Sequence, residues 1–152
     1  ANADIAKGLQ GFGGVYGRLE RKPALHGAVL IDDTYNANPD SMKAAIDVLV
    51  KQPGVKILVL GDMGELGADA ENMHAEIGAY AKAAGLAVLY CLGEASRAMV
   101  RAFGTGAMHF ESPEAIAAAL VPQLDNNSTV LVKGSRFMRM ERVVKALAEE
   151  MH

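Results

Sequence analysis

Short apolar runs alternate along the chain with segments whose apolar residues recur every three or four positions. The runs are rich in Val, Leu and Ile and lack strict alternation, which is typical of strands covered on both faces of a sheet. They predict strands at 28–31, 55–60, 87–92 and 129–132. A glycine-rich segment, residues 8–22, precedes them and is expected to be a linker followed by an edge strand.

The intervening segments have the periodicity of amphipathic helices. Apolar residues recur at helical spacing in 42–49, 73–84 and 140–151, and more weakly in 95–103. Another helix is expected to begin at Ser112, with Pro113 at its first position, and to end before Pro122. The alternation predicts an α/β fold: a Rossmann-like three-layer domain with a mostly parallel sheet of about six strands and helices on both faces.

Composition narrows the class of protein. The chain has 152 residues, enough for one ordinary domain, and its net charge of −3 with only 5% aromatic residues does not favour a nucleic-acid partner. The single cysteine, Cys91, lies in an apolar run and excludes a disulfide within the chain. Because no apolar run approaches the roughly 20 residues of a membrane span, no membrane contact is expected, and a cytoplasmic location is favoured.

Three polar loops follow predicted strands, at 32–39, 61–67 and 133–139. The carboxyl ends of parallel strands share one edge of the sheet, so the three loops should converge there as a polar site. The residues of interest are Asp32, Asp33, Asn36 and Asn38 in the first loop, Asp62 and Glu65 in the second, and Lys133, Gly134, Ser135 and Arg136 in the third. Asn38 followed by Pro39 is also an ordinary helix start, and Asp62 with Glu65 also suits a solvated turn.

The third loop, from Lys133 to Arg136, is predicted to lead straight into a helix. Cations at a helix start are opposed by the helix dipole, which favours a bound anion such as a carboxylate or phosphate over a merely solvated turn. His74 is placed on the polar side of its helix and is expected to lie at the surface or between helices. The chain has no HExxH, CxxC or EF-hand spacing, so no metal site is expected. It also has no GxxxxGK[ST] phosphate loop and no GxGxxG between a strand and a helix, which does not favour a nicotinamide-binding site.

Four motifs together resemble the C-terminal domain of the Mur ligases. They are Gly17-Arg18-Leu19-Glu20, DDTYNANPDSM at 32–42, LGDMGELG at 60–67 with His74 downstream, and LVKGSR at 131–136. The first loop and KGSR are similar to the branch that adds D-alanyl-D-alanine, whereas related ligases have a histidine where this chain has Asn36. The resemblance implies a Mur ligase C-terminal domain over residues 14–152, with 1–13 being the tail of a central domain, a linker or an unrelated remnant.

Mur ligases have three domains, which bind the UDP-sugar peptide, then ATP, then the acceptor. The resemblance therefore implies an acceptor-binding domain that also closes over ATP, with ATP and Mg²⁺ bound mainly by a central domain and UDP-N-acetylmuramoyl-tripeptide by other domains. It implies nucleotide contacts for Arg18, Asp33 and Asn36, and acceptor contacts with D-alanyl-D-alanine for the KGSR region. Asp32, Asn38, Asp62, Glu65 and His74 would line the site, and no residue is assigned to catalysis.

Two other functions remain open at this stage. One is a related ATP-dependent amide ligase, either another Mur ligase or one like folylpolyglutamate synthase. The other is an α/β module that binds a small anion without catalysis. Because the phosphate loop is absent, the chain by itself is expected to be inactive.

Overall fold

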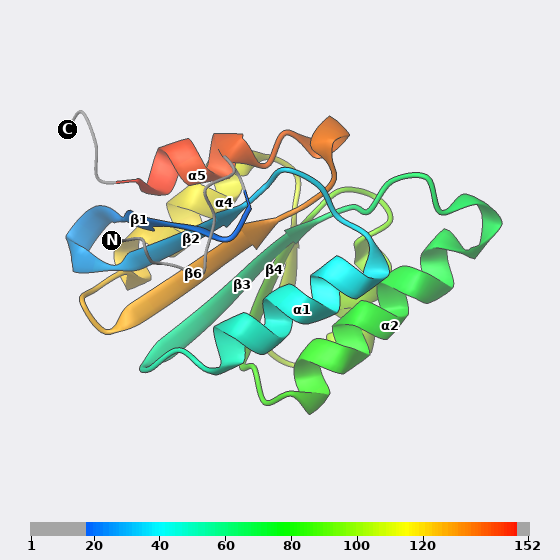
Figure 1. The fold of residues 1–152 in the computed structure, drawn as a ribbon, viewed down its shortest axis with the longest axis horizontal. Helices are drawn as coiled ribbons and strands as arrows, with labels where there is room; N and C mark the ends of the chain where they lie inside the picture. The colour runs from blue at the N-terminus through cyan, green and yellow to red at the C-terminus, as the bar shows by residue number, and fades with distance from the viewer. Residues whose placement is uncertain (1–17, 149–152) are drawn as a thin grey trace.

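One six-stranded sheet forms the centre of the molecule in a computed structural model that describes residues 18–148 (Figure 1). The strands lie in the order β1-β2-β6-β3-β4-β5, and all neighbours are parallel except β1, which runs antiparallel to β2 at the edge. Their bounds are β1 Glu20–Pro23, β2 Val29–Asp33, β3 Val55–Gly61, β4 Val88–Leu92, β5 Ala107–Phe110 and β6 Ser128–Lys133.

Helices cover both faces of the sheet, with α1 and α2 on one side and α4 and α5 on the other (Figure 1). Their bounds are α1 Pro39–Val50, α2 Ala70–Ala83, α3 Arg97–Phe103, α4 Pro113–Leu120 and α5 Glu141–Leu147, with 3-10 turns at Leu25–Gly27, Gly67–Asp69, Val121–Gln123 and Arg136–Met138. The chain reaches β5 at one edge and then returns to place β6 between β2 and β3. Because such crossovers are right-handed, this reversal puts α4 on the face opposite α1, α2 and α3.

Two apolar cores result, one on each face of the sheet. Alternate residues along each strand enter one core or the other: Leu30 packs with α4 and α5, whereas Ile31 packs with α1, α2 and α3. Both side chains are almost fully buried. Strands buried on both sides explain why the sequence shows continuous apolar runs rather than alternation.

Most of the predicted elements are confirmed. The three-layer α/β fold, the four predicted central strands, the edge strand β1 and the helix start at Ser112, whose Oγ accepts from the Ala115 amide at 3.0 Å, all occur. Strand β5 was not among the four predicted runs, because it is only four residues long and its side chains are at most partly buried. The predicted domain boundary near residue 13 lies outside the described residues. The last helix, predicted over 140–151, ends at Leu147, and the next residue, Ala148, is extended and forms a β-bridge with Ala24. Within the described part of the chain, no helix is long and apolar enough to span a bilayer.

Candidate functional site

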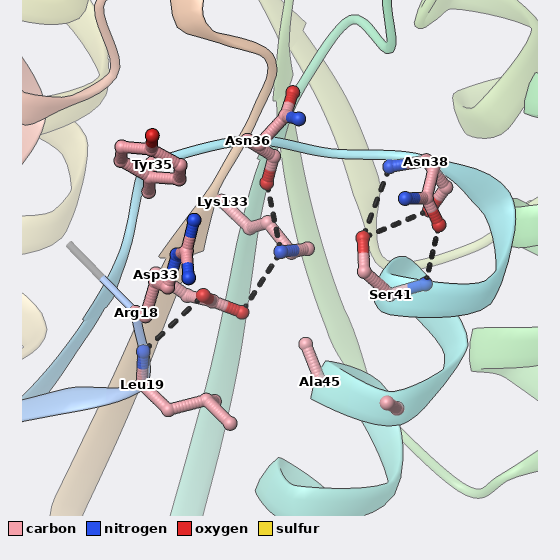
Figure 2. Close-up of a pocket in the computed structure, with 10 residues that line it drawn as sticks. Arg18, Leu19, Asp33, Tyr35, Asn36, Asn38, Ser41, Ala45 and Lys133 are labelled. Atoms are coloured by element: carbon pink, nitrogen blue, oxygen red, sulfur yellow. Dashed lines mark hydrogen bonds and ion pairs between the residues drawn. The ribbon is translucent and has the colours of Figure 1, made fainter. Parts of the chain in front are cut away.

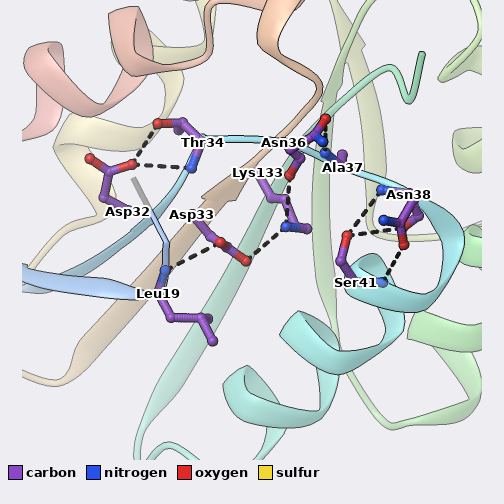
Figure 3. A network of polar contacts seen from close by, with 9 residues as sticks. All are labelled: Leu19, Asp32, Asp33, Thr34, Asn36, Ala37, Asn38, Ser41 and Lys133. Carbon is purple, nitrogen blue, oxygen red and sulfur yellow. Dashed lines mark hydrogen bonds and ion pairs between the residues drawn. The ribbon is translucent and has the colours of Figure 1, made fainter. Parts of the chain in front are cut away.

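The first loop begins later than the sequence suggests, because β2 continues through both aspartates. Successive side chains of a strand point to opposite faces, so Asp32 and Asp33 separate. Asp32 lies 3.0 Å from Lys22 Nζ and accepts hydrogen bonds from the amide and hydroxyl of Thr34 (Figure 3). It does not line the pockets described below, so the site-lining role predicted for Asp32 is not supported by its position.

Asp33 forms a buried ion pair with Lys133 across the ends of β2 and β6 (Figure 2). Lys133 Nζ lies 2.9 Å from Asp33 Oδ2 and also donates to the Asn36 carbonyl at 2.9 Å. The other Asp33 oxygen accepts from the Leu19 amide at 3.2 Å. Lys133 is therefore neutralised by a protein carboxylate and fixes the first loop, rather than standing free as a cation for a bound anion.

A first pocket, which we call the Arg18 pocket, opens above this ion pair (Figure 2). Its volume is about 360 Å³. It is lined by Arg18, Leu19, Asp33, Tyr35, Asn36, Asn38, Ser41, Ala44, Ala45 and Lys133. Arg18 is exposed, and its guanidinium lies 4.0 Å from the centroid of the Tyr35 ring. The pocket thus combines an exposed cation, an aromatic face and a neutralised carboxylate.

A second pocket, which we call the Glu65 pocket, lies where all three loops meet. Its volume is about 590 Å³, and it is lined by Asn36, Ala37, Asn38, Gly64, Glu65, Leu66, Ser135, Arg136 and Phe137. Glu65 and Arg136 are exposed and are the charged residues in this lining. The buried Ser135 hydroxyl has no hydrogen-bond partner among the described residues.

Tyr35 lines the Arg18 pocket and contacts the arginine of each pocket, and it was not singled out by the sequence. The Arg136 guanidinium lies 4.8 Å from the centroid of the same ring that Arg18 contacts. Cation–π attraction of this kind orients a guanidinium without consuming its hydrogen-bond donors. The available signal was an aromatic residue within a loop of otherwise small and polar residues.

The second loop is fixed from below by two side chains that were predicted to line the site. The Asp62 carboxylate accepts from the amides of Ala95 and Ser96 at 3.0 and 2.8 Å. The buried His74 accepts from the Met63 amide at 2.9 Å through Nε2, while Nδ1 lies 2.7 Å from the Ala70 carbonyl. These contacts require Nδ1 to carry the proton. His74 thus lies buried beneath the loop, so of the two positions expected for it, at the surface or between helices, the surface one is wrong.

In the first loop the expected helix start is confirmed, whereas in the third loop a prediction needs revision. Asn38 caps α1 by accepting from the Ser41 amide at 2.8 Å, in a reciprocal capping box, although it still borders both pockets. The KGSR segment does not lead straight into a helix. A three-residue 3-10 turn and the left-handed residue Arg139 intervene before α5 begins. The helix-dipole argument for a bound anion is therefore wrong. The exposed charge of Arg136 is the remaining feature of this loop that favours an anion.

Convergence of the three loops is confirmed. The Ser135 amide donates to the Asp62 carbonyl at 3.0 Å, and Lys133 binds both Asp33 and the backbone of Asn36. The pocket walls bring together Arg18, Asp33, Asn36, Asn38, Glu65, Lys133, Ser135 and Arg136, and leave out Asp32, Asp62, His74 and Gly134. Gly134 packs so closely that a side-chain carbon there would meet Met140.

Comparison with known proteins gives the same assignment. The family described as "Mur ligase, glutamate ligase domain" matches residues 17–136. The chain belongs to this family. The UDP-N-acetylmuramoyl-tripeptide–D-alanyl-D-alanine ligase of Escherichia coli is 43% identical over 147 residues, which cover 95% of this chain and 32% of that protein. The chain therefore spans about a third of the length of the curated relatives it matches.

Solved structures extend the comparison to the fold. The MurF ligase of Thermotoga maritima, solved in complex with ADP, superposes on this Mur ligase domain with a TM-score of 0.81 at 30% identity, over 94% of this chain and 33% of that one. The bifunctional folylpolyglutamate synthase/dihydrofolate synthase of Yersinia pestis has a TM-score of 0.63 at 18% identity, over 95% of this chain and 34% of that one. At that identity the likeness shows the shared fold alone.

Proposed function

We propose that this chain is the C-terminal domain of an ATP-dependent ligase that joins D-alanyl-D-alanine to UDP-N-acetylmuramoyl-tripeptide in the cytoplasm. The observation that carries the proposal is the pair of adjacent pockets at one sheet edge, each with one exposed arginine. One pocket would contact a nucleotide held by another domain, and the other would hold the acceptor. The relatives that match most of this chain carry the name of that ligase.

The proposed reaction transfers the γ-phosphate of ATP to the donor carboxylate and releases ADP. The amine of the acceptor then attacks the acyl carbon, phosphate leaves, and the amine proton is lost as the amide bond forms. This chemistry requires cations opposite the phosphates and an acceptor whose amine is aimed at the acyl carbon. The domain would supply the cation Arg18 on the nucleotide side, and on the acceptor side it would orient the attacking amine.

Mg²⁺ does not fit a site built by this domain alone. Among residues 18–148, no group of three His, Cys, Asp or Glu side chains is arranged to hold a metal ion. Asp33, the carboxylate nearest the proposed nucleotide, is already paired with Lys133. We therefore assign ATP and its metal mainly to the central domain of the proposed ligase.

The proposed nucleotide-side roles belong to Arg18, Asp33 and Asn36. Arg18 has an exposed guanidinium that Tyr35 orients, and Asn36 is held by the Lys133 bond to its carbonyl. Each Asp33 oxygen accepts one hydrogen bond within the described chain and retains capacity for one more. This arrangement suits a hydroxyl or amino group of the nucleotide better than a phosphate next to Asp33.

The test is to separate the two pockets kinetically in a three-domain ligase that contains this chain. Arg18→Ala is expected to raise the KM for ATP, and Arg136→Ala the KM for D-alanyl-D-alanine. A lost charge-assisted contact costs about 1.5–3 kcal/mol, so each change should be roughly 10- to 100-fold. Assaying glutamate in place of the dipeptide as the acceptor would test the alternative of a ligase like folylpolyglutamate synthase. Turnover with glutamate but not with the dipeptide would contradict the proposal, as would an Arg136 defect confined to ATP.

A further inference from the structure

We propose that the Glu65 carboxylate binds the ammonium group of the acceptor dipeptide, opposite Arg136, which takes its carboxylate. The inference rests on the proposed function and adds to it the residue that selects and orients the amine. Glu65 comes from the loop after β3, and Arg136 from the loop after β6. The two residues thus reach the pocket from neighbouring strands of the sheet.

The charges of the Glu65 pocket match a zwitterion. Its lining contains one acid and one base, and no ion pair joins Glu65 to Arg136 in the part of the chain that the structure describes. Two opposite charges held apart in one pocket suit a ligand that carries one charge of each sign at its two ends. D-alanyl-D-alanine is such a ligand at neutral pH. A phosphate or a simple carboxylate would leave Glu65 facing like charge.

The pocket also offers a buried polar group that requires a partner. Ser135 is 4% exposed, and its hydroxyl has no hydrogen-bond partner among the described residues. Buried hydroxyls in folded proteins are nearly always paired, so an unpaired one that lines a pocket points to a ligand. Together with the volume of about 590 Å³, which is within the range of small-molecule sites, this supports a bound dipeptide.

The backbone of Glu65 is a second sign that the side chain is there for function. Its φ is +59°, a left-handed conformation that glutamate rarely adopts, although Gly64 and Gly67 stand nearby in the same loop. Such strain persists where the surrounding structure fixes the residue. Here two residues just before Glu65 are anchored: Asp62 accepts from the Ser96 amide, and the Met63 amide donates to His74.

Glu65→Gln in the three-domain ligase is the primary test. It removes the charge and keeps the shape of the side chain, so the KM for D-alanyl-D-alanine should rise about tenfold or more while the KM for ATP is unchanged. The probe that identifies the ammonium is N-propionyl-D-alanine, which is the same dipeptide without its amine. As a competitive inhibitor it should bind the wild-type and Glu65→Gln enzymes equally well.

Two further variants keep the test independent of folding. Glu65→Gly relieves the left-handed strain, so it should preserve or raise the melting temperature while still raising the dipeptide KM. Glu114→Gln, at an exposed glutamate in the first turn of α4 on the opposite face of the sheet, is the matched control and should leave both KM values unchanged.

The outcomes separate this inference from the proposed function. If the wild-type ligase does not accept D-alanyl-D-alanine, the proposed function fails. If the wild-type enzyme accepts it but Glu65→Gln keeps the wild-type dipeptide KM, the inference alone fails. It also fails if Glu65→Gln weakens N-propionyl-D-alanine as much as the dipeptide, because Glu65 would then act on something other than the amine.

Discussion

The Asp33–Lys133 ion pair fixes the relation between the first and third loops. Its side chains are only 9% and 4% exposed, so both charges have lost most of their hydration. A buried pair of this kind is weak evidence for stability in itself, but removing one partner leaves the other charge buried and uncompensated. The pair therefore fixes the floor of the Arg18 pocket and, through the Lys133 bond to the Asn36 carbonyl, one residue of the Glu65 pocket wall.

Lys133→Met tests this reasoning in the 152-residue chain. Leaving the Asp33 carboxylate unpaired should lower the free energy of unfolding by about 3–5 kcal/mol, measured by urea unfolding. Adding Asp33→Leu to the same chain should restore much of the loss, because no buried charge then remains. Arg136→Ala is the matched control, since its side chain is exposed, and should change stability by no more than about 0.5 kcal/mol. A Lys133→Met chain as stable as the wild type would mean that the pair is open to water.

Sequence reasoning reached the right loops but not the role of every residue. The direction of Asp32 and Asp33 depends on whether β2 ends before or after them, and strand ends are the least certain feature of a sequence pattern. Lys133 finds its partner 100 positions away, so no local signal reveals the pairing. His74 was assigned to the exposed side of its helix because the sequence does not show that the Met63 amide lies over it.

Helices α2 and α3 touch through a glycine. A side-chain carbon built on Gly78 would overlap the carbonyl of Met99, so the backbone of α3 occupies the space that a larger residue would need. The contact matters for the site, because α3 begins at the amides that hold Asp62. Close packing at Gly78 thus supports the second loop indirectly.

Gly78→Ala is expected to destabilise the chain, contrary to helix propensity. Propensity alone would stabilise an alanine by about 1 kcal/mol, but overpacking against α3 typically costs about 1–3 kcal/mol. Ala79→Gly, at the exposed neighbouring position of α2, should show the ordinary propensity loss of about 1 kcal/mol. Melting curves of both variants would check this, and a Gly78→Ala chain more stable than wild type would show that the two helices lie farther apart.

Elements were predictable where the apolar pattern was long or a cap was present. The strands β3 and β6 carry continuous apolar runs, and α4 has Ser112 before Pro113. Strand β5 has neither signal: it is short, and its residues are only partly buried. The 3-10 turn after Ser135 is hidden because its residues also suit a helix start.

The described fold contains two complete cores, yet its pockets are open at the sheet edge. Apolar side chains fill both faces of the sheet, so the chain has what an independent domain needs. The Arg18 and Glu65 pockets present exposed cations without an anion to neutralise them in the described chain. This domain should therefore be stable on its own, whereas the proposed reaction requires surfaces that other domains would contribute.

Isolated, the 152-residue chain should fold cooperatively but neither hydrolyse ATP nor form an amide bond. The sequence lacks a phosphate loop, and positioning the β- and γ-phosphates is most of what a phosphoryl-transfer site must do. Circular dichroism should show a single melting transition, and a coupled assay for ADP release should show no turnover above that of a Lys133→Met control. Adding D-alanyl-D-alanine should not change that result, because the amine has no acyl phosphate to attack. Sustained ADP release by the wild-type chain, abolished in Arg18→Ala, would instead place the catalytic nucleotide site within this domain.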